Sequence, residues 1–321
     1  MYSRIAGTGR CLPKKILTNA DLEKLVDTTD EWIKSRTGIE RRHVVSDGET
    51  TGTLCEGAAR EAMAAAGVSA FDIDLVIVGT TTPDQVFPNM GCLLQERLGI
   101  HGCPAFSLEA ACTGFIYALA IADQFVRDGK AKCALVVGGE TLTNIVDWND
   151  RATVVLFGDG AGAVVLQPAE KPGIMSTHLH ADGAYKDLLY FPSGIGQGLD
   201  SIHEGNDAVR MKGNEVFRVA VNTLGAIVEE TLEANQMTRA DLDWLIPHQA
   251  NIRIIKATAR KLEMSMDQVI QTIQDHGNTS TASVPMALDV AVRSGQIKRG
   301  DMLLLEAFGG GFTWGSALVR Y

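Results

Sequence analysis

The sequence lacks the features of membrane-spanning, exported and nucleic-acid-coating proteins. No apolar run approaches the roughly 18 residues that a spanning helix requires, and the first residues, MYSRIAGTGRCLP, contain no apolar signal segment. Basic residues are in deficit, with 29 Lys and Arg against 39 Asp and Glu and a net charge of −10. This balance argues against binding along nucleic acid or anionic membranes. We therefore expect a soluble, cytoplasmic protein with neither of these partners.

Patterns for metal, disulfide and dinucleotide sites are absent too. The six cysteines contain no Cys-x-x-Cys spacing, so the sequence indicates neither a disulfide scaffold nor a metal site. The GDGAGA stretch at 158–163 precedes a predicted strand rather than a helix, which argues against dinucleotide binding. The chain has enough hydrophobic residues, 45% of 321, to form a large core. This length suits two domains or one large α/β unit.

Strand-length apolar runs alternate with helical patterns along the chain. Their hydrophobicity is continuous rather than alternating, which predicts strands buried on both faces, as in layered α/β folds. The predicted strands lie within residues 74–82, 133–140, 162–168, 243–248 and 301–308.

The chain also contains an internal repeat. Residues 65–79 and 234–248 each read as the end of a helix, a short connection and a buried strand, and Asp74 matches Asp243 at a separation of 169 residues. A second match pairs Asp123 with Asp289 at a separation of 166 residues. Two matches of similar separation predict a duplicated fold.

The duplication predicts an N-terminal half of residues 1–172 and a C-terminal half of residues 173–321, with no flexible linker between them. The 166-residue separation places Cys112 over Asn278. We therefore expect two equivalent helix starts, one with Cys112 and the other with Asn278, to meet across a pseudo-twofold axis.

The stretch EAACTGF at 109–115 contains a candidate nucleophile. Apolar residues from Phe115 to Val126 recur at helical spacing, which predicts a helix that starts near Cys112. A sulfur at that position would lie at the positive end of the helix dipole, where the thiolate is favoured. The alternative is an ordinary core cysteine packed beside two alanines.

Two polar residues are candidate partners for this cysteine. His248 follows the predicted strand at 243–248, and such strand ends often carry active residues. Asn278, in DHGNTSTASVP, can donate a hydrogen bond without accepting a proton, which suits stabilisation of an oxyanion. The alternatives are a capped loop histidine and a helix cap.

The FGGGF stretch at 308–312 lies between two predicted strands. Three consecutive glycines allow unusual dihedral angles or a close approach of the backbone to another group. A free backbone N–H in this stretch can bind a developing oxyanion, whereas the alternative is a plain glycine turn.

Two segments suggest contacts with an anionic ligand or partner. In TTDEWIKSR, Thr28 and Glu31 form a capping-box pattern, which places Trp32 and Arg36 on one helical face. Such a pair can stack on an adenine and hold a phosphate, or it can be an ordinary surface cation–π pair. The predicted helix in NIRIIKATARKL presents a basic stripe of Arg253, Lys256, Arg260 and Lys261, which suits an acidic macromolecule or is a solvated face.

Together these stretches resemble the thiolase-fold condensing enzymes, and most closely the β-ketoacyl-acyl carrier protein synthase III family. The resemblance covers essentially the whole chain. It includes TNADLEKLVDTTDEWI, RTGIE, GCPAF, EAACTGF, FGDGAGA, STHLHADG, IPHQAN, HGNTS and the ending EAFGGGFTWGSALVR. It implies a duplicated α-β-α-β-α layered fold with two pseudo-twofold-related halves.

The resemblance assigns roles to the candidate catalytic residues. It implies that Cys112 accepts an acyl group, that His248 and Asn278 bind the malonyl thioester oxygen during decarboxylation, and that the backbone N–H groups of Cys112 and Gly310 form an oxyanion hole. The His and Asn pairing argues against an elongating synthase, which uses two histidines. A thiolase is disfavoured as well, because the last cysteine is Cys133 and none lies near the carboxyl end.

The resemblance also implies binding surfaces. The acyl pocket would be bounded by Phe157 and by Phe87, which reaches across a homodimer interface, while Gln85 and residues 194–202 leave the primer open. The coenzyme A site would comprise Trp32, Arg36, Arg151, Gly213, Asn214, Phe217 and Asn251. The surface for acyl carrier protein would comprise Gln249, Ala250, Asn251, Ile252, Arg253, Lys256, Arg260 and Lys261.

The function implied is decarboxylative condensation of an acyl-coenzyme A primer, acetyl in the simplest case, with malonyl-acyl carrier protein. This reaction initiates dissociated fatty-acid synthesis and requires no metal or redox cofactor. The alternatives are a synthase specialised for longer or branched primers or for secondary metabolism, a cysteine-dependent thioester hydrolase, and a non-catalytic module that binds carrier protein.

Overall fold

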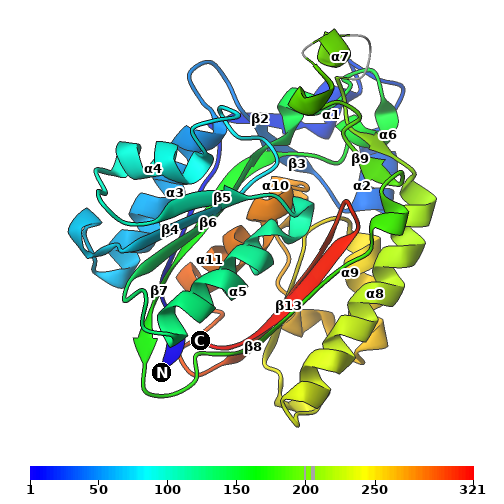
Figure 1. Ribbon diagram of the computed structural model, residues 1–321. Coiled ribbons are helices and arrows are strands. Elements are labelled where there is room, and N and C mark those ends of the chain that lie inside the picture. The colour runs from blue at the N-terminus through cyan, green and yellow to red at the C-terminus, as the bar shows by residue number, and fades with distance from the viewer. Residues whose placement is uncertain (199, 204–206) are drawn as a thin grey trace.

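Two mixed β-sheets form the framework of the protein (Figure 1). The computed structural model describes residues 1–198, 200–203 and 207–321. The five-stranded sheet has the order β1 (Tyr2–Cys11), β7 (Asp159–Ala169), β6 (Ala134–Thr141), β4 (Leu75–Gly79) and β5 (Ala105–Leu108). The four-stranded sheet has the order β11 (Trp244–Pro247), β12 (Met302–Gly309), β13 (Thr313–Arg320) and β8 (Ile174–Ala181). All five predicted strands are therefore confirmed.

Helices form three layers around these sheets. Figure 1 shows α5 (Gly114–Arg127) and α11 (Ser283–Arg293) between the two sheets. Helices α3 (Thr51–Ala66) and α4 (Met90–Leu98) cover the outside of the five-stranded sheet, and α8 (Gly213–Ala234) and α9 (Ile252–Lys261) cover the outside of the other. The result is the expected α-β-α-β-α layering.

Shorter elements connect these layers. Paired strands β2 and β3 form one small sheet, and β9 and β10 form another. The remaining elements are α1 (Asn19–Leu22), α2 (Asp30–Thr37), α6 (Arg151–Val154), α7 (Asp200–His203), α10 (Ile273–His276), β2 (Lys15–Thr18), β3 (Arg41–Val44), β9 (Leu189–Tyr190) and β10 (Arg210–Met211).

The central helices lie in a large apolar cluster between the two sheets. Phe115, Leu119 and Val126 of α5 and Leu288 of α11 are fully buried in one cluster with residues of both sheets. At about 25 cal/mol per Å² of apolar surface removed from water, each large side chain there contributes on the order of 1.5–3 kcal/mol. Because both helices start inside this core, any side chain at their amino termini is held by rigid surroundings.

The two halves match at a separation of 169 residues where the central helices begin. A 3₁₀ turn over Ala111–Thr113 precedes α5, and one over Ser280–Ala282 precedes α11. The first residue of each turn is left-handed, with φ of 45° at Ala111 and 47° at Ser280. The predicted superposition of Cys112 on Asn278 is therefore wrong, because Thr281 occupies the position equivalent to Cys112.

The 166-residue separation holds only where these helices end. Asp123 pairs with Arg127 near the end of α5, and Asp289 pairs with Arg293 near the end of α11. Helix α5 has 14 residues and α11 has 11, so the register changes by three residues between the two ends.

Part of the N-terminal half packs on the C-terminal half. Leu22, Ile33 and Ile39 share a core cluster with residues of α8 and α9, and Glu40 N donates to Gln274 O at 2.9 Å. Strand β7 ends at Ala169 and β8 begins at Ile174 in the other sheet. The division into residues 1–172 and 173–321 remains a prediction.

Two further features of the structure concern membranes and metals. Among the described residues, no helix combines the length and the apolar character needed to cross a membrane. Within the same ranges, no three His, Cys, Asp or Glu side chains gather in an arrangement that would hold a metal ion.

Candidate active site

A cavity of about 920 Å³ opens beside Cys112. Its wall includes the loop at 81–86, the segment at 141–145 after β6 and the glycines that join β12 to β13. Ser280, from the turn before α11, lines it as well. The cavity therefore draws on both sheets and both central helix starts.

The turn that carries Cys112 is held from several sides. Ala111, just before it, adopts a left-handed conformation with φ of 45°, which costs a residue with a side chain about 1–2 kcal/mol. Ala111 N donates to Glu109 Oε1 at 2.7 Å, and Ala111 O accepts from Thr281 Oγ1 at 2.7 Å. A Cβ on Gly309 would lie 2.6 Å from Cys112 N, so only glycine fits there. A strained turn that is fixed this firmly is typical of a functional site.

Cys112 is a buried thiol with 7% of its surface exposed. Burial raises its pKa to about 12, and a hydrogen bond with the Ser280 side chain opposes that rise. The predicted preference for thiolate is thus outweighed by the loss of hydration, and α5 itself begins two residues later, at Gly114. A nucleophile at this position needs a neighbouring group that accepts its proton.

His248 follows β11 directly, as the sequence predicts, and is 4% exposed. Burial lowers its pKa to about 3, so the imidazole is neutral at physiological pH. His248 Nδ1 lies 2.5 Å from Ser283 Oγ, which also accepts from Gln249 N at 3.3 Å. When the Ser283 hydroxyl donates to Nδ1, the imidazole proton resides on Nε2, which becomes a hydrogen-bond donor.

Asn278 is buried beside the cavity wall, with 7% of its surface exposed. Asn278 forms an isolated parallel β-bridge with Phe157. Its backbone N–H donates to Leu156 O at 2.9 Å, and its backbone O accepts from Gly158 N at 3.0 Å. The side-chain Oδ1 accepts from Ser280 N at 2.9 Å. Because Oδ1 is engaged in this way, Nδ2 is the group that can donate to a ligand.

The cavity contains several of the residues predicted for the acyl pocket and the oxyanion hole. Phe157, Gly310 and Gln85 line it together with Cys112. Phe87 does not line it and is 84% exposed, which is compatible with a residue that faces a second subunit. Residue 199, in the stretch at 194–202, lies outside the described residues.

The predicted nucleotide-binding group forms a surface cluster. Trp32 has two guanidinium groups over its ring, Arg36 at 5.0 Å and Arg151 at 4.8 Å from the ring centroid. The helix cap differs from the prediction, because Thr29 rather than Thr28 is the N-cap and its side chain accepts from Trp32 N at 3.1 Å. The shift by one residue leaves Trp32 and Arg36 on one face of α2.

The basic stripe on α9 is exposed as predicted. Arg253, Lys256, Arg260 and Lys261 all face solvent. The prediction that Gln249 belongs to the surface for acyl carrier protein is wrong, because this residue is 1% exposed. Its amide donates to Pro247 O and Ile270 O and accepts from two backbone N–H groups near α10, so it fixes the loop after His248 from within. Ala250 and Ile252 are half-buried beside the stripe.

The predicted tunnel residues lie at the start of α8 and α9. Gly213 and Asn214 are exposed, and Asn251 caps α9 by accepting from Arg253 N at 2.8 Å. The Arg253 guanidinium lies over the Phe217 ring, 5.2 Å from the ring centroid. None of these four predicted residues lines the cavity beside Cys112 in the described part of the chain.

Sequence reasoning missed the polar residues that support the cysteine. Glu140, at the end of β6, is 0% exposed, and its Oε1 lies 2.8 Å from Thr281 Oγ1. Ser280, Thr281 and Ser283 contact Cys112, Ala111 and His248, respectively. A single acidic residue inside the apolar run CALVVGGE was the available signal for Glu140, because buried carboxylates need specific partners.

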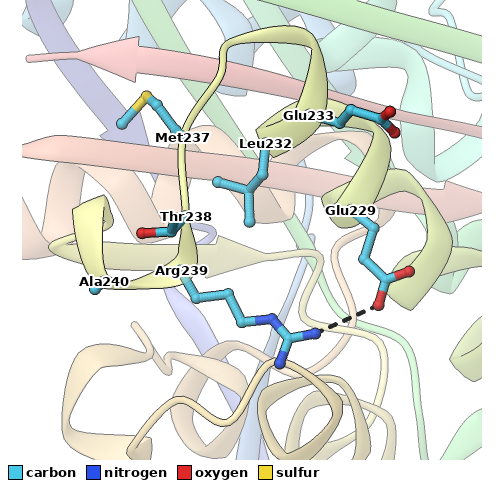
Figure 2. A pocket seen from close by; sticks show the side chains of 7 residues that line it. All are labelled: Glu229, Leu232, Glu233, Met237, Thr238, Arg239 and Ala240. Atoms are coloured by element: carbon cyan, nitrogen blue, oxygen red, sulfur yellow. Dashed lines mark hydrogen bonds and ion pairs between the residues drawn. The ribbon is translucent and has the colours of Figure 1, made fainter.

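A second hollow, of about 520 Å³, lies at the end of α8 (Figure 2). It is lined by Leu232, Met237 and charged groups, and Figure 2 shows Arg239 reaching toward Glu229, with an ion pair of 3.4 Å. It contains neither cysteine nor histidine. We therefore place the candidate active site in the cavity beside Cys112.

Comparisons with known proteins identify the family of the chain. Residues 106–183 match the family described as 3-oxoacyl-(acyl-carrier-protein) synthase III, and residues 232–321 match its C-terminal part. A β-ketoacyl-(acyl-carrier-protein) synthase III of Thioalkalivibrio sulfidiphilus is 66% identical over 100% of this chain and 99% of that protein.

Solved structures extend the comparison to the fold. The 3-oxoacyl-(acyl-carrier-protein) synthase III of Aquifex aeolicus is 46% identical, with a TM-score of 0.94 over 99% of this chain and 100% of that chain. A priming β-ketosynthase from a polyketide biosynthetic pathway is 38% identical, with a TM-score of 0.95 over 99% and 96% of the two chains. The chain therefore belongs to the β-ketoacyl-acyl carrier protein synthase III family of thiolase-fold condensing enzymes.

Proposed function

We propose that this protein condenses an acyl-coenzyme A primer with malonyl-acyl carrier protein and so initiates dissociated fatty-acid synthesis. The products are a 3-ketoacyl-acyl carrier protein, carbon dioxide and free coenzyme A. The observation that carries the proposal is the strained, firmly held turn of Cys112 at a cavity to which both halves contribute. The buried His248 and Asn278 supply neutral donors nearby.

The first half-reaction transfers the primer to the enzyme. The Cys112 thiolate attacks the thioester carbonyl of the primer, whose oxygen becomes an oxyanion in the tetrahedral intermediate. The backbone N–H groups of Cys112 and Gly310 donate to this oxyanion, and such a donor typically lowers the barrier by about 2.7–4 kcal/mol. Coenzyme A then leaves with the proton that the Cys112 thiol lost before the attack, and the acyl group remains on sulfur.

The second half-reaction forms the carbon–carbon bond. Malonyl-acyl carrier protein loses carbon dioxide, and the electron pair of the broken bond becomes the enolate of its thioester. His248 Nε2–H and Asn278 Nδ2–H donate to the enolate oxygen. The enolate carbon attacks the acyl carbonyl and the Cys112 thiolate leaves. It then takes one proton from solvent, which regenerates the thiol.

A neutral His248 suits this role better than a charged one. Its pKa of about 3 means that it donates a hydrogen bond without delivering a proton to the enolate. A protonated enolate would be a weaker nucleophile for the acyl-enzyme. Every step moves an acyl group, a proton or carbon dioxide, so the chemistry needs no redox cofactor or metal, and coenzyme A enters only as part of the substrate.

The partners follow from the surfaces. The α9 stripe of Arg253, Lys256, Arg260 and Lys261 would bind acidic acyl carrier protein, and Trp32 with Arg36 and Arg151 would bind the nucleotide of coenzyme A. The exposed Phe87 and Val86 support a homodimer in which each Phe87 closes the acyl pocket of the other subunit. Both substrates are dissolved in the cytoplasm, where we place the protein.

The primer can be larger than acetyl. The cavity volume of about 920 Å³ far exceeds the space that an acetyl group needs, and a structurally similar enzyme is named for priming a polyketide pathway. These observations favour a primer-specialised synthase as the second candidate function.

Intact-protein mass spectrometry tests the proposal. The protein is incubated with coenzyme A thioesters of acetyl, branched and longer acyl groups, and malonyl-acyl carrier protein is then added. We expect one acyl adduct on wild-type protein, none on Cys112→Ser, and loss of the adduct with formation of the 3-ketoacyl product. Steady hydrolysis of acyl-coenzyme A without condensation would instead identify a thioester hydrolase, and docking without acylation would identify a non-catalytic module.

A further inference from the structure

Glu140 is a buried carboxyl that connects the two halves below the cavity. It accepts from Thr81 N at 3.1 Å, Thr81 Oγ1 at 2.9 Å and Thr82 Oγ1 at 2.7 Å, all from the loop after β4. From the turn before α11, Thr281 Oγ1 lies 2.8 Å and Ser280 Oγ 3.4 Å from Glu140 Oε1. The catalytic steps described above do not use this carboxyl.

The hydrogen bonds accommodate both protonation states of Glu140. Thr281 Oγ1 lies 2.7 Å from Ala111 O and 2.8 Å from Glu140 Oε1, but a hydroxyl carries a single hydrogen. Both contacts are hydrogen bonds when Glu140 carries a proton on Oε1 and donates to Thr281. The donors from Thr81 and Thr82 stabilise the ionised form instead.

Ser280 links this carboxyl to the nucleophile. Its side chain hydrogen-bonds Cys112, and its hydroxyl donates to Glu140 Oε1 at 3.4 Å. Its backbone is left-handed, with φ of 47°, and its N–H donates to Asn278 Oδ1 at 2.9 Å. A hydroxyl has one hydrogen and two lone pairs, so Ser280 can accept from the Cys112 thiol while it donates to Glu140. Once the proton is on Glu140, Ser280 donates to the Cys112 thiolate, the direction that lowers the pKa of this thiol.

Burial raises the pKa of Glu140 to about 7, and the hydrogen bonds from Thr82, Thr281 and Thr81 oppose this rise. The titratable groups that interact with it are the thiols of Cys112, from the turn before α5, and Cys55, from α3, and burial raises the pKa of both. The carboxylates of Asp84 and Glu109 act on these same thiols and disfavour a second negative charge. A group that accepts the thiol proton at neutral pH therefore helps acylation.

We propose that Glu140 accepts the Cys112 thiol proton through the Ser280 hydroxyl during acylation. The inference rests on the proposed role of Cys112 as the acylated nucleophile. The S–H bond breaks as its proton passes to Ser280 Oγ, and the hydrogen of Ser280 passes to Glu140 Oε1. Sulfur keeps the electron pair and attacks the thioester. The proton then returns through Ser280 to the departing coenzyme A sulfur, so the step has no net proton change.

The test measures Cys112 reactivity against pH between 5.5 and 9.5. Acetylation by acetyl-coenzyme A is followed by intact mass, and alkylation by iodoacetamide is followed by peptide mass spectrometry at Cys112. We expect both wild-type rates to rise with an apparent pKa near that of Glu140, about 7. In Glu140→Gln and Ser280→Ala, the rates at pH 7 should fall by about 10²-fold, the contribution typical of a positioned base. The inflection near pH 7 should disappear, because the pKa of the thiol itself lies above the measured range.

Conservative variants distinguish the relay from a structural role. Ser280→Thr keeps the hydroxyl and Glu140→Asp keeps the carboxyl, so both should retain the inflection near neutral pH. Rates that fall by one factor at every pH in Glu140→Gln and Ser280→Ala would overturn the relay. Thermal unfolding checks that each variant folds, and Ser280→Ala decides the question if Glu140→Gln does not fold.

The two assays separate this inference from the proposed function. Wild-type protein that is alkylated with the expected inflection but is not acylated by any acyl-coenzyme A would refute the proposed function. It would still support transfer of the Cys112 thiol proton to Glu140. Wild-type protein that is acetylated, with variants that keep the wild-type pH profile, would refute the relay alone.

Discussion

The two halves build the same backbone and give it different chemistry. Each central helix follows a 3₁₀ turn whose first residue is left-handed, Ala111 in one half and Ser280 in the other. Cys112 of the first turn corresponds to Thr281 of the second. Thr281 Oγ1 donates to Ala111 O and so holds the turn that carries Cys112, the proposed nucleophile of the other half. The two turns have the same geometry, and the turn before α11 holds the turn before α5 in place through this hydrogen bond.

The sheets show the same contrast through their buried carboxyls. Glu140 in the five-stranded sheet accepts hydrogen bonds from both halves. Glu306 in the four-stranded sheet is 0% exposed, and neither of its side-chain oxygens has a hydrogen-bond partner among the described residues. Its backbone O accepts from the N–H of His248, a proposed catalytic residue, at 2.8 Å. The carboxyl is thus next to the proposed site and has no hydrogen bond of its own in the described part of the chain.

The largest effect should come from removing the donors of the C-terminal half. We expect His248→Ala and Asn278→Ala each to lower the rate of malonyl-acyl carrier protein decarboxylation by about 10²–10³-fold, as the loss of an oxyanion donor does. Acylation of Cys112 should change little, because in the proposed mechanism backbone N–H groups bind the oxyanion of that step. Release of labelled carbon dioxide and intact mass measure the two steps separately.

His180→Ala is the matched control for these variants. His180 lies on β8, contacts Glu230 at 2.9 Å and stacks on Trp314, outside the cavity. It should leave both steps unchanged. Equal losses of acylation and decarboxylation in His248→Ala would contradict the division of labour between the halves.

The sequence predicted the layered α/β fold because the patterns that indicate strands and helices are local in the chain. Continuous apolar runs are enough to identify the strands, and helical spacing identifies α5 and α9. The superposition of Cys112 on Asn278 failed because α5 and α11 differ by three residues, which one fixed separation cannot represent. Gln249 was misplaced because its burial depends on backbone groups near α10 that are distant in sequence.

The supporting network of the nucleophile was beyond the reach of local patterns. Glu140 is held by Thr81 and Thr82 from one loop and by Ser280 and Thr281 from a turn about 140 residues away. Each of these residues alone reads as an ordinary small polar side chain. Only the folded arrangement shows that they share one carboxyl.

The next effect in size concerns the unpartnered carboxyl. Burial raises the pKa of Glu306 from its usual 4.5 to about 8. Between these values the unfolded chain loses this proton and the folded protein keeps it, so the free energy of unfolding falls as pH rises, by up to about 1.4 kcal/mol per pH unit. Glu306→Gln should remove this slope, to be measured by urea unfolding from pH 5 to 9.

The exposed Glu96→Gln is the control for Glu306, and it should keep the wild-type slope. An unchanged slope in Glu306→Gln would show that this carboxyl does not keep its proton in the folded protein. A lower stability of Glu306→Gln at every pH would not affect the conclusion, because only the dependence on pH reports the titration.

A smaller effect should distinguish the outer layers of the two halves. We expect Arg253→Glu and Lys256→Glu, on the outer face of α9, to raise the KM for malonyl-acyl carrier protein about tenfold each, because a rim charge mainly affects association. The effect should weaken with added salt. Lys132→Glu, an exposed charge change in the N-terminal half, should leave the KM unchanged. A similar loss in all three variants would indicate a general charge effect instead of docking on α9.

The smallest effect concerns the part of the N-terminal half that packs on the other half. Trp32 lies under Arg36 and Arg151 at 5.0 and 4.8 Å, and Arg151 also donates to Asp27 O at 2.9 Å. If this cluster holds the nucleotide of coenzyme A, Trp32→Ala should raise the KM for acyl-coenzyme A about fivefold, since an exposed cation–π contact contributes about 0.5–1 kcal/mol. Acylation by the short thioester acetyl-N-acetylcysteamine, which has no nucleotide, should not change. If Trp32→Ala changed the reaction with acyl-coenzyme A and with acetyl-N-acetylcysteamine equally, Trp32 would contribute to the packing of α2 against α9 and not to substrate binding.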